Sequence, residues 1–303
     1  MEKSIFNEFR LRMLEQNLNI YGIIVKQNQQ KIQLKFRSDD KVNIYSASKG
    51  VTSLAIGMLQ DAGLLQLDDK ILDYFPAYQK DAAPGTEEIT IRDLLHMQSG
   101  KHNFFDFKTR KGDKLEAFFK YSLDFHPGFH FSYSNGCTYM LSRLVEKLTG
   151  ETLRDFLVPR LFDPLEIENP QWFTCIDGHT LGATGLFLTT EELSRIGDLY
   201  LQEGTYQGKR LVSADYIKAS YEDKITTHDP KATPNGREYG YQVWIGQDLE
   251  SYRLDGKYGQ YAIVFPKVGA TVTITAHEEF RSSEIVKAVY EDILPHLEAN
   301  HLK

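Results

Sequence analysis

A serine and a lysine, Ser46 and Lys49, stand three positions apart just before the apolar run that begins at Val51. Residues three apart share one face of a helix, so the lysine amine can reach the serine hydroxyl within one turn. A free serine is a poor nucleophile and needs an adjacent base. Lysine acts as that base when burial or a nearby cation lowers its pKa. At a helix N-terminus this pair predicts a nucleophile and its base, because free N–H groups there stabilise an oxyanion.

A second candidate is the polar triplet Tyr133-Ser134-Asn135, on a loop that runs directly into a predicted helix. A tyrosine beside lysines is expected to have a lowered pKa and to share in proton transfer. The Asn135 amide could orient a lysine or bind a substrate carbonyl. The structural alternative is a buried tyrosine followed by an asparagine that caps the helix.

A third candidate is Lys257-Tyr258-Gly259-Gln260, which we predict to begin a late strand. A glycine in such a place lets the backbone approach a ligand closely. If this strand lies beside Ser46, its edge could offer one backbone N–H, with the Ser46 N–H as the second donor of an oxyanion hole. Lys257, Tyr258, Gly259 and Gln260 are therefore predicted to contact the substrate.

Two of these patterns occur a second time in a less suitable context. Ser38 and Lys41 are also three apart, but no apolar helix follows them, so we predict a polar turn. Lys267-Val268-Gly269 follows a proline between two strand-like runs and is predicted to be a hairpin turn. Context therefore favours Ser46 over Ser38.

The composition narrows the class of protein. The chain has 303 residues with 41% hydrophobic and 25% charged residues, which is ordinary for a globular protein. Its formal net charge of −7, without basic clusters, argues against nucleic acid or an anionic membrane as the main partner. The first residues lack the apolar centre of a signal peptide, and no stretch is long and apolar enough for a membrane span. We expect a cytoplasmic protein that acts on a small molecule; the pattern does not indicate its oligomeric state.

The cysteines and histidines do not indicate a cofactor. The two cysteines, Cys137 and Cys175, are expected to be reduced and structural. His96, His126 and His130 are scattered and show no metal-ligand spacing. We therefore expect no metal and no other cofactor.

The periodicity of the apolar residues predicts an α+β fold. Strands are expected at 20–26, 31–36, 239–246, 251–256, 260–266 and 270–276. Helices are expected up to about residue 16 and at 51–63, 90–98, 138–150, 189–204, 213–222 and 283–297. Strands at both ends predict one antiparallel sheet built from both ends of the chain, flanked by helices. We expect a sheet domain of residues 1–75 and 175–303, a helical domain of residues 76–174, and the active site between them.

The order of the three motifs resembles that of the serine penicillin-recognising enzymes: serine at a helix start, Tyr-x-Asn in the helical middle, and lysine–glycine on a late strand. The Tyr-x-Asn form resembles class C β-lactamases and their relatives, which include DD-carboxypeptidases, D-aminopeptidases, esterases and 6-aminohexanoate-dimer hydrolase. The similarity covers most of the chain, including "ITIRDLLHMQSG", "GATGLFLTTEELSRIGDLYLQEG" and "GQYAIVFPKVGATVTITA". It implies the β-lactamase and penicillin-binding-protein fold.

The resemblance also implies roles for single residues. Ser46 is similar to the acylated nucleophile, Lys49 to its general base and Tyr133 to a second proton-transfer group. Asn135 corresponds to a contact with the substrate amide, and Lys257 to the lysine of the third motif. The resemblance implies that the backbone N–H groups of Ser46 and Gln260 are the oxyanion donors. Tyr258 departs from the family, which usually has a small threonine or serine that helps to hold a substrate carboxylate.

These roles imply a serine hydrolase that forms an acyl-enzyme on an amide or ester. Because of Tyr258, we expect small uncharged esters, amides or peptide fragments as substrates. The alternatives are a non-hydrolytic sensor of cell-wall fragments and a true class C β-lactamase. The aromatic stretches around Phe104, Phe105 and Phe129 either belong to the core or form an apolar wall near Tyr133.

Overall fold

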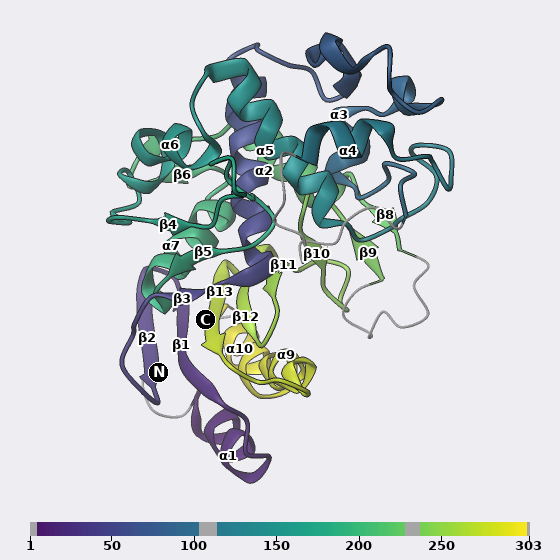
Figure 1. Cartoon of the computed structure of the whole chain (residues 1–303). Coiled ribbons are helices and arrows are strands. Elements are labelled where there is room, and N and C mark those ends of the chain that lie inside the picture. The colour runs from purple at the N-terminus through teal and green to yellow at the C-terminus, as the bar shows by residue number, and fades with distance from the viewer. Residues whose placement is uncertain (1–4, 103–113, 228–236, 302–303) are drawn as a thin grey trace.

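An eight-stranded antiparallel sheet forms the base of the computed structural model, which describes residues 5–102, 114–227 and 237–301. The strand order is β2-β1-β13-β12-β11-β10-β9-β8, so the N-terminal hairpin pairs with the last strand of the C-terminal meander (Figure 1). The strands are β1 (Ile20–Gln27), β2 (Gln30–Lys35), β8 (Ile225–Thr226), β9 (Glu238–Tyr239), β10 (Trp244–Ile245), β11 (Tyr252–Gly256), β12 (Gln260–Phe265) and β13 (Ala270–Ala276). The prediction of an α+β fold with one sheet from both chain ends is confirmed.

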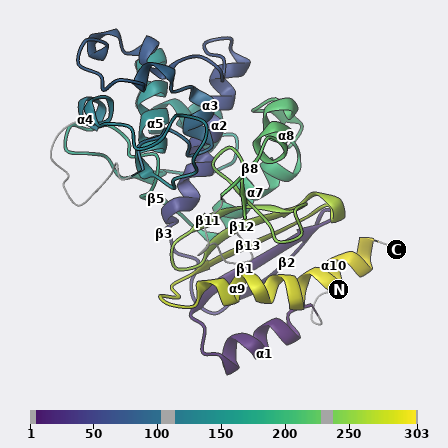
Figure 2. The same ribbon diagram turned by 90° about the vertical axis from the view of Figure 1, so that its right-hand side faces the viewer.

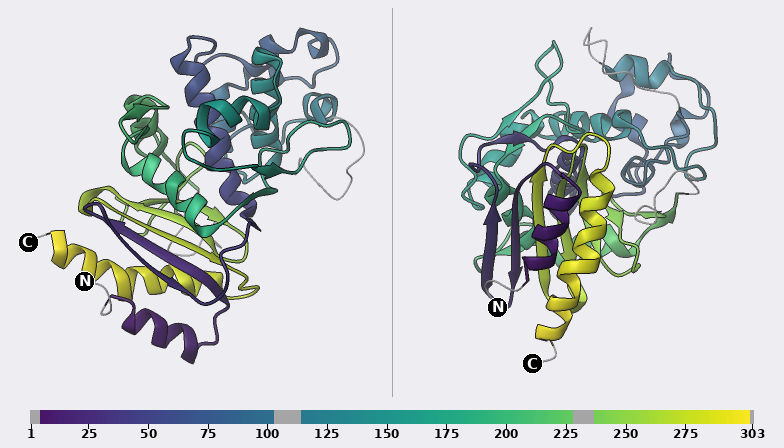
Figure 3. Two further views of the ribbon diagram at one scale, coloured as in Figure 1. Left: turned by 90° about the vertical axis from the view of Figure 1, so that its left-hand side faces the viewer. Right: turned by 90° about the horizontal axis from the view of Figure 1, so that it is seen from below.

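Helices cover both faces of this sheet (Figure 2). One face packs against α1 (Asn7–Glu15) and the C-terminal run of α9 (Ser282–Ala288), η7 (Val289–Ile293) and α10 (Leu294–His301). Side chains such as Ile23 and Ile274 point to that side. The other face packs against α7 (Thr190–Leu201), as both views of Figure 3 allow the reader to follow. Successive side chains of a strand point to opposite faces of the sheet, so each strand contributes alternate residues to the two cores.

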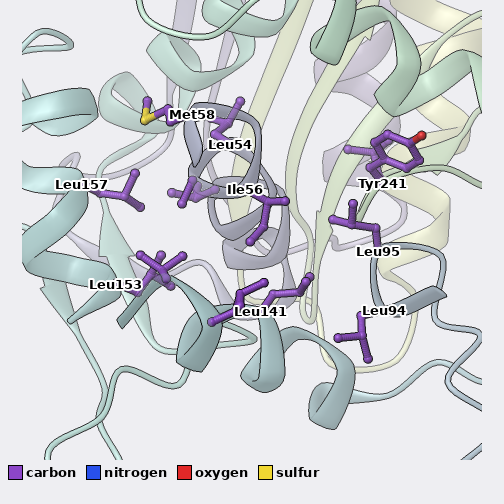
Figure 4. Packing of buried hydrophobic residues seen from close by; sticks show 14 of the residues in the cluster. Leu54, Ile56, Met58, Leu94, Leu95, Leu141, Leu153, Leu157 and Tyr241 are labelled. Atoms are coloured by element: carbon purple, nitrogen blue, oxygen red, sulfur yellow. The ribbon is translucent and has the colours of Figure 1, made fainter. Parts of the chain in front are cut away.

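The helical part of the molecule surrounds α2 (Ser48–Asp61), whose residues from Ser48 to Leu59 are buried on all sides. A helix that is buried all round belongs in the centre of a core. In Figure 4 its apolar side chains meet those of the neighbouring helices. The other helices of this part are α3 (Ile91–Leu95), α4 (Lys114–Lys120), α5 (Asn135–Thr149), α6 (Leu153–Leu157) and α8 (Ala214–Glu222). Short helical turns are η1 (Tyr45–Ala47), η2 (Ile71–Tyr74), η3 (Pro76–Tyr78), η4 (Thr86–Glu88), η5 (Val158–Phe162) and η6 (Pro266–Val268).

Two small sheets complete the fold. One has the order β3-β5-β4, from β3 (Val42–Asn43), β5 (Leu186–Leu188) and β4 (Gln171–Trp172), and the other joins β6 (Thr205–Tyr206) to β7 (Lys209–Arg210). Strands this short carry too few residues for a periodic signal, which is why the sequence did not predict them. The β3–β5 pair lies directly before η1 and fixes where α2 begins.

One predicted strand is wrong in its bounds. Residues 239–246 form two short strands, β9 and β10, with a turn between them in which the Gly240 N–H donates to the Val243 carbonyl. Gly240 is needed there because a Cβ would lie 2.0 Å from the Ser220 carbonyl oxygen. The predicted domain boundaries stay a prediction, since α2 packs on helices of the middle region and also on β11. Within the described ranges, no helix is long and apolar enough to cross a membrane.

Candidate active site

The proposed nucleophile lies in a sharp turn between β3 and α2. Tyr45, the residue before Ser46, has φ = 48°, a conformation that costs free energy in any residue other than glycine. Two polar groups hold it. The Asn43 Oδ1 accepts the Tyr45 N–H at 2.8 Å, and the Ser48 Oγ donates to the Tyr45 carbonyl at 2.6 Å. The turn therefore fixes Ser46 at the N-terminal end of α2, where the helix dipole favours an oxyanion.

Lys49 lies against Ser46, as the spacing predicts. Its Nζ is 3.1 Å from the Ser46 Oγ, 2.7 Å from the Asn135 Oδ1 and 3.0 Å from the Ala183 carbonyl oxygen. The last two atoms can only accept hydrogen bonds. A neutral amine has two N–H groups, which these acceptors take up, so its lone pair is left for the Ser46 hydroxyl. The geometry therefore suits a base.

Burial gives Lys49 the protonation state that this role requires. The residue is 1% exposed, and desolvation lowers the pKa of its amine to about 7. At neutral pH a large fraction of Lys49 is therefore uncharged and able to accept a proton. Leu254 of β11 contributes to this apolar setting, because it packs against Gly50, the next residue of α2.

Asn135 reaches Lys49 from the first residue of α5. The cap of this helix is Ser134, whose Oγ accepts the Gly136 N–H at 3.1 Å. The alternative that Asn135 is the capping residue is therefore wrong, and its side chain is left to hold the lysine. The loop that carries Tyr133 runs directly into this capped helix, so Tyr133 and Asn135 keep a fixed spacing.

Tyr133 is placed by an aromatic cluster at the edge of the large sheet. Its ring stacks on Trp244 of β10 at 5.6 Å between centroids and meets Tyr239 edge-on at 6.1 Å. The Lys49 Nζ lies 4.8 Å from the Tyr133 ring centroid. Ser46 forms a hydrogen bond with the Tyr133 hydroxyl. The sequence therefore predicted correctly that Tyr133 lies beside Ser46 and Lys49.

The predicted direction of the Tyr133 pKa is wrong. Burial of the hydroxyl raises its pKa above the ordinary value, although the hydrogen bond from Ser46 lowers it and 40% of the residue surface stays exposed. Lysine was expected to lower this pKa, but only one lysine is close, and burial makes that lysine a weak cation. Tyr133 is therefore protonated at neutral pH and suited to donate a proton.

The third motif is not on a strand that faces Ser46. Lys257, Tyr258 and Gly259 form the turn between β11 and β12, closed by the Gly259 N–H to the Gly256 carbonyl at 3.2 Å. Tyr258 has φ = 69°. The Lys257 amine lies over the Tyr258 ring, 4.6 Å from its centroid, and is exposed to solvent. The amine of Lys257 is therefore turned to solvent, and its contact with a substrate stays a prediction.

Tyr258, whose orientation the sequence leaves open, lies against the turn before Ser46, and Gln260 lies farther inside the sheet. The Tyr258 ring meets Tyr45 edge-on at 5.1 Å and stacks on His277 at 4.6 Å, so it flanks the turn before Ser46. Gln260 begins β12, where it pairs with Gly256 of β11, and its side-chain amide donates to the Ala276 carbonyl. The structure does not bring Gln260 to the edge that faces Ser46.

The end of β11 lies beside the nucleophile instead. A Cβ on Gly256 would lie 2.1 Å from the carbonyl oxygen of Ile44, two residues before Ser46. β10 pairs with β11 only at Arg253 and Tyr252, so residues 254–256 form an edge that β10 leaves free. Figure 1 shows β11 beside the N-terminal end of α2. Backbone groups of this edge are thus available to a substrate.

The remaining predicted features have mixed outcomes. Phe104 and Phe105 lie outside the described residues, while Phe129 is 80% exposed and belongs to no core. His96 is buried and bonds to the Asp223 carbonyl at 2.8 Å. No group of three or more His, Cys, Asp or Glu is placed to hold a metal in the part of the chain that the structure describes.

The fold and this serine–lysine–tyrosine geometry agree with the comparisons to known proteins. A family model described as Beta-lactamase matches residues 20–292. The chain belongs to the β-lactamase family. In line with this family, the structure superimposes on a putative 6-aminohexanoate-dimer hydrolase from Bacillus anthracis with a TM-score of 0.77 at 20% identity, covering 95% of this chain and 82% of that one. A class C β-lactamase gives a TM-score of 0.75 at 15% identity, covering 96% and 95%.

Two relatives of known activity within the β-lactamase family are similar in sequence. Teichoic acid D-alanine hydrolase of Staphylococcus aureus is 24% identical over 268 residues, which cover 83% of this chain. Lovastatin esterase of Penicillium rubens is 30% identical over 161 residues, which cover 45% of this chain. The matches span 65% of the hydrolase and 40% of the esterase. The resemblance predicted from the three motifs is confirmed at the level of the family.

Sequence reasoning missed several residues of this β-lactamase-family site. Asn43 and Trp244 position the Ser46 turn and Tyr133, and neither belongs to a recognisable motif. Leu254, Asp255 and Gly256 form the free edge of β11 and directly precede the predicted third motif, Lys257-Tyr258-Gly259. The available signal was the predicted strand 251–256, which ends in glycine before the turn.

Proposed function

We propose that the protein is a serine hydrolase that forms an acyl-enzyme on Ser46 from a small ester or amide. The arrangement of Lys49 is the observation that carries this proposal. Its two acceptor contacts and its lowered pKa leave a lone pair for the Ser46 hydroxyl. A protein that only binds its ligand has no need for a buried, partly neutral lysine in contact with a serine, since burying that amine costs stability.

In the acylation step, the Lys49 amine takes the proton of Ser46 while the Oγ attacks the substrate carbonyl carbon. The carbonyl π electrons move to the oxygen, giving a tetrahedral oxyanion. The Ser46 N–H at the helix start is one donor for it, and the second lies on the free edge of β11 or in the turn that follows. As the carbon–oxygen or carbon–nitrogen bond breaks, the leaving group receives a proton from the Tyr133 hydroxyl, and the Lys49 ammonium returns one to Tyr133.

Deacylation repeats these steps with water in place of Ser46. Neutral Lys49 takes a proton from the water, and the hydroxide attacks the ester carbonyl of the acyl-enzyme. Ser46 leaves and recovers its proton from the Lys49 ammonium. Asn135 holds the amine through both halves of the cycle.

The site favours substrates without a carboxylate near the scissile bond. Lys257 is turned to solvent, and Leu254 occupies the place next to Gly50 on the edge of β11. Lys257 therefore offers no fixed cation to a substrate carboxylate, and the buried Arg253 of β11 is already paired with Asp255. The names of the two relatives, an esterase and a D-alanine hydrolase, support an ester substrate.

The experiment that tests this function is covalent labelling. A fluorophosphonate probe should add to Ser46, as mass spectrometry of the intact protein and its peptides would show. Ser46→Ala should lose the label and the hydrolysis of p-nitrophenyl acetate. Ser38→Ala, in the second Ser-x-x-Lys of the chain, is the matched control and should keep both. Absence of any label on the folded protein would favour the non-hydrolytic sensor.

The β-lactamase alternative has its own test. Turnover of nitrocefin with kcat/KM of about 10⁴ M⁻¹s⁻¹ or above, together with no esterase activity, would make the protein a β-lactamase. We expect the opposite pattern.

The cytoplasmic location also stays a prediction, which fractionation of cells that produce the protein would test.

A further inference from the structure

Asp255 stands next to the nucleophile on the free edge of β11, and the proposed mechanism does not use it. Both of its neighbours in the chain pack against the catalytic turn: Leu254 on Gly50 and Gly256 on the Ile44 carbonyl. Side chains alternate along a strand, so Asp255 projects to the opposite face from Leu254. β10 ends its pairing at Arg253, so no strand covers Asp255 on the outer side.

The same edge faces Tyr133. Tyr133 stacks on Trp244, the residue of β10 that pairs with Arg253, so its ring lies where β10 stops and β11 continues. The charge of Asp255 acts on the Tyr133 hydroxyl and raises its pKa. Asp255 therefore lies at the end of β11 that adjoins the Ser46 turn and close enough to Tyr133 to act on its charge, with its side chain on the sheet face opposite to Leu254.

Only one of the two carboxylate oxygens of Asp255 accepts a hydrogen bond from the described residues. Its Oδ2 accepts a hydrogen bond from the Arg253 Nε at 2.9 Å. Its Oδ1 has no hydrogen-bond donor among the described residues, and 26% of the side chain is exposed. Burial raises the pKa of the Asp255 carboxyl, and the guanidinium of Arg253, which is 4% exposed, lowers it. A purely structural ion pair would not require an open oxygen at the mouth of a site.

We propose that Asp255 binds a protonated amine of the substrate, so that preferred substrates are esters or amides with an ammonium group close to the scissile carbonyl. The inference rests on the proposed function of Ser46. The Lys257 amine, the other cation near this end of β11, is exposed and lies over the Tyr258 ring.

A matched pair of substrates tests the proposal. Alanine methyl ester and methyl isobutyrate have the same skeleton, with an ammonium group in one and a methyl group in the other. The readout is the ratio of their kcat/KM values, measured by methanol release and corrected for the ratio of their uncatalysed rates. The wild type should prefer the ammonium ester. Asp255→Asn should lower this ratio by roughly tenfold to a hundredfold, the usual effect of losing a charge-assisted hydrogen bond.

Asp163→Asn is the control variant, because Asp163 is an exposed residue that ends η5 in the helical region and the change in net charge is the same. It should leave the ratio unchanged. Asp255→Glu should restore part of the preference. If Asp255→Asn hydrolyses both esters with the wild-type ratio, Asp255 forms a structural ion pair only, and the proposal is overturned.

A measurement on the wild type covers the case in which Asp255→Asn does not fold. The substrate amine loses its proton near the ordinary α-amino pKa of about 7.7–8.0. The preference should therefore fall between about pH 7 and pH 9, whereas titration of Lys49 affects both esters alike and cancels. A flat ratio overturns the proposal. If the wild type hydrolyses neither ester and Ser46 does not react with the fluorophosphonate, the proposed function has failed. If Ser46 reacts and methyl isobutyrate is hydrolysed without any preference, only the role of Asp255 has failed.

Discussion

Replacing Asn135 by aspartate should move the pH dependence of catalysis to more alkaline values. Asn135 Oδ1 is 2.7 Å from the Lys49 Nζ, so Asn135→Asp places a carboxylate against the amine. The ion pair stabilises the ammonium form and raises the Lys49 pKa from its wild-type value of about 7. An aspartate in the first turn of α5 is also favourable to the helix dipole, so the fold should tolerate it.

The size of the effect follows from this contact. Two unit charges about 3 Å apart attract by roughly 5 kcal/mol at an effective dielectric constant of about 20, and desolvation of the new carboxylate offsets part of this. Carboxylate–cation pairs at such distances shift a pKa by about 1–3 units. The neutral fraction of Lys49 at pH 7 should then fall by roughly five- to five-hundredfold. kcat/KM should fall by the same factor and recover in good part towards pH 10.

The assay is kcat/KM for p-nitrophenyl acetate from about pH 5 to pH 10, with Ser46→Ala as the blank, because this parameter reports the pKa values of the free enzyme. Asn7→Asp is the matched control: Asn7 is also the first residue of a helix, α1, and is exposed. The wild type and this control should show an acidic limb near pH 7. If the limb of Asn135→Asp stays there or moves to lower pH, Lys49 is not the base.

Three further outcomes are expected. Lys49→Met should remove a buried amine whose pKa is about 7 in the folded protein and about 10.5 in the unfolded chain. Between these pH values the folded wild type binds fewer protons than the unfolded chain, so its stability rises with pH. The gain in unfolding free energy from the variant, measured in urea, should therefore be largest near pH 6 and shrink towards pH 10. Tyr133→Phe and Lys49→Ala should each slow acylation by a factor of about 10² or more in stopped-flow assays. The double variant should lose less than the product of the two factors, because the two side chains form one proton-transfer unit. A loss equal to that product would show that they act independently. Gly256→Ala should place a Cβ 2.1 Å from the Ile44 carbonyl oxygen. This clash should lower the unfolding free energy by about 1–3 kcal/mol and displace the Ser46 turn, so that kcat falls more than KM rises. Wild-type kinetics in this variant would contradict the packing.

The sequence alone predicts the features that depend on short-range patterns. The apolar period after Ser46 predicts α2, and the three-residue spacing predicts the contact between Ser46 and Lys49. The alternating apolar strands at both chain ends predict the composition of the large sheet. Helix geometry fixes neighbours three apart, so such contacts follow from the residues themselves.

Only the tertiary structure decides which strand end faces the nucleophile. The pattern Lys257-Tyr258-Gly259 has the residue types of a binding motif, but pairing of β11 with β12 makes these residues a turn and leaves Asp255 and Gly256 on the free edge. Strand pairing between distant segments is not encoded in local composition, and a shift of a few residues changes which side chain meets the site.

The pKa values also depend on the tertiary structure. A lysine and a tyrosine in contact suggested a lowered tyrosine pKa, whereas burial lowers the pKa of Lys49 and raises that of Tyr133. Burial produces both shifts, and it depends on contacts with distant segments, such as Ala183 at Lys49 and Trp244 at Tyr133. A sequence shows which groups can titrate, but the free energy of removing them from water is known only once the chain has folded around them.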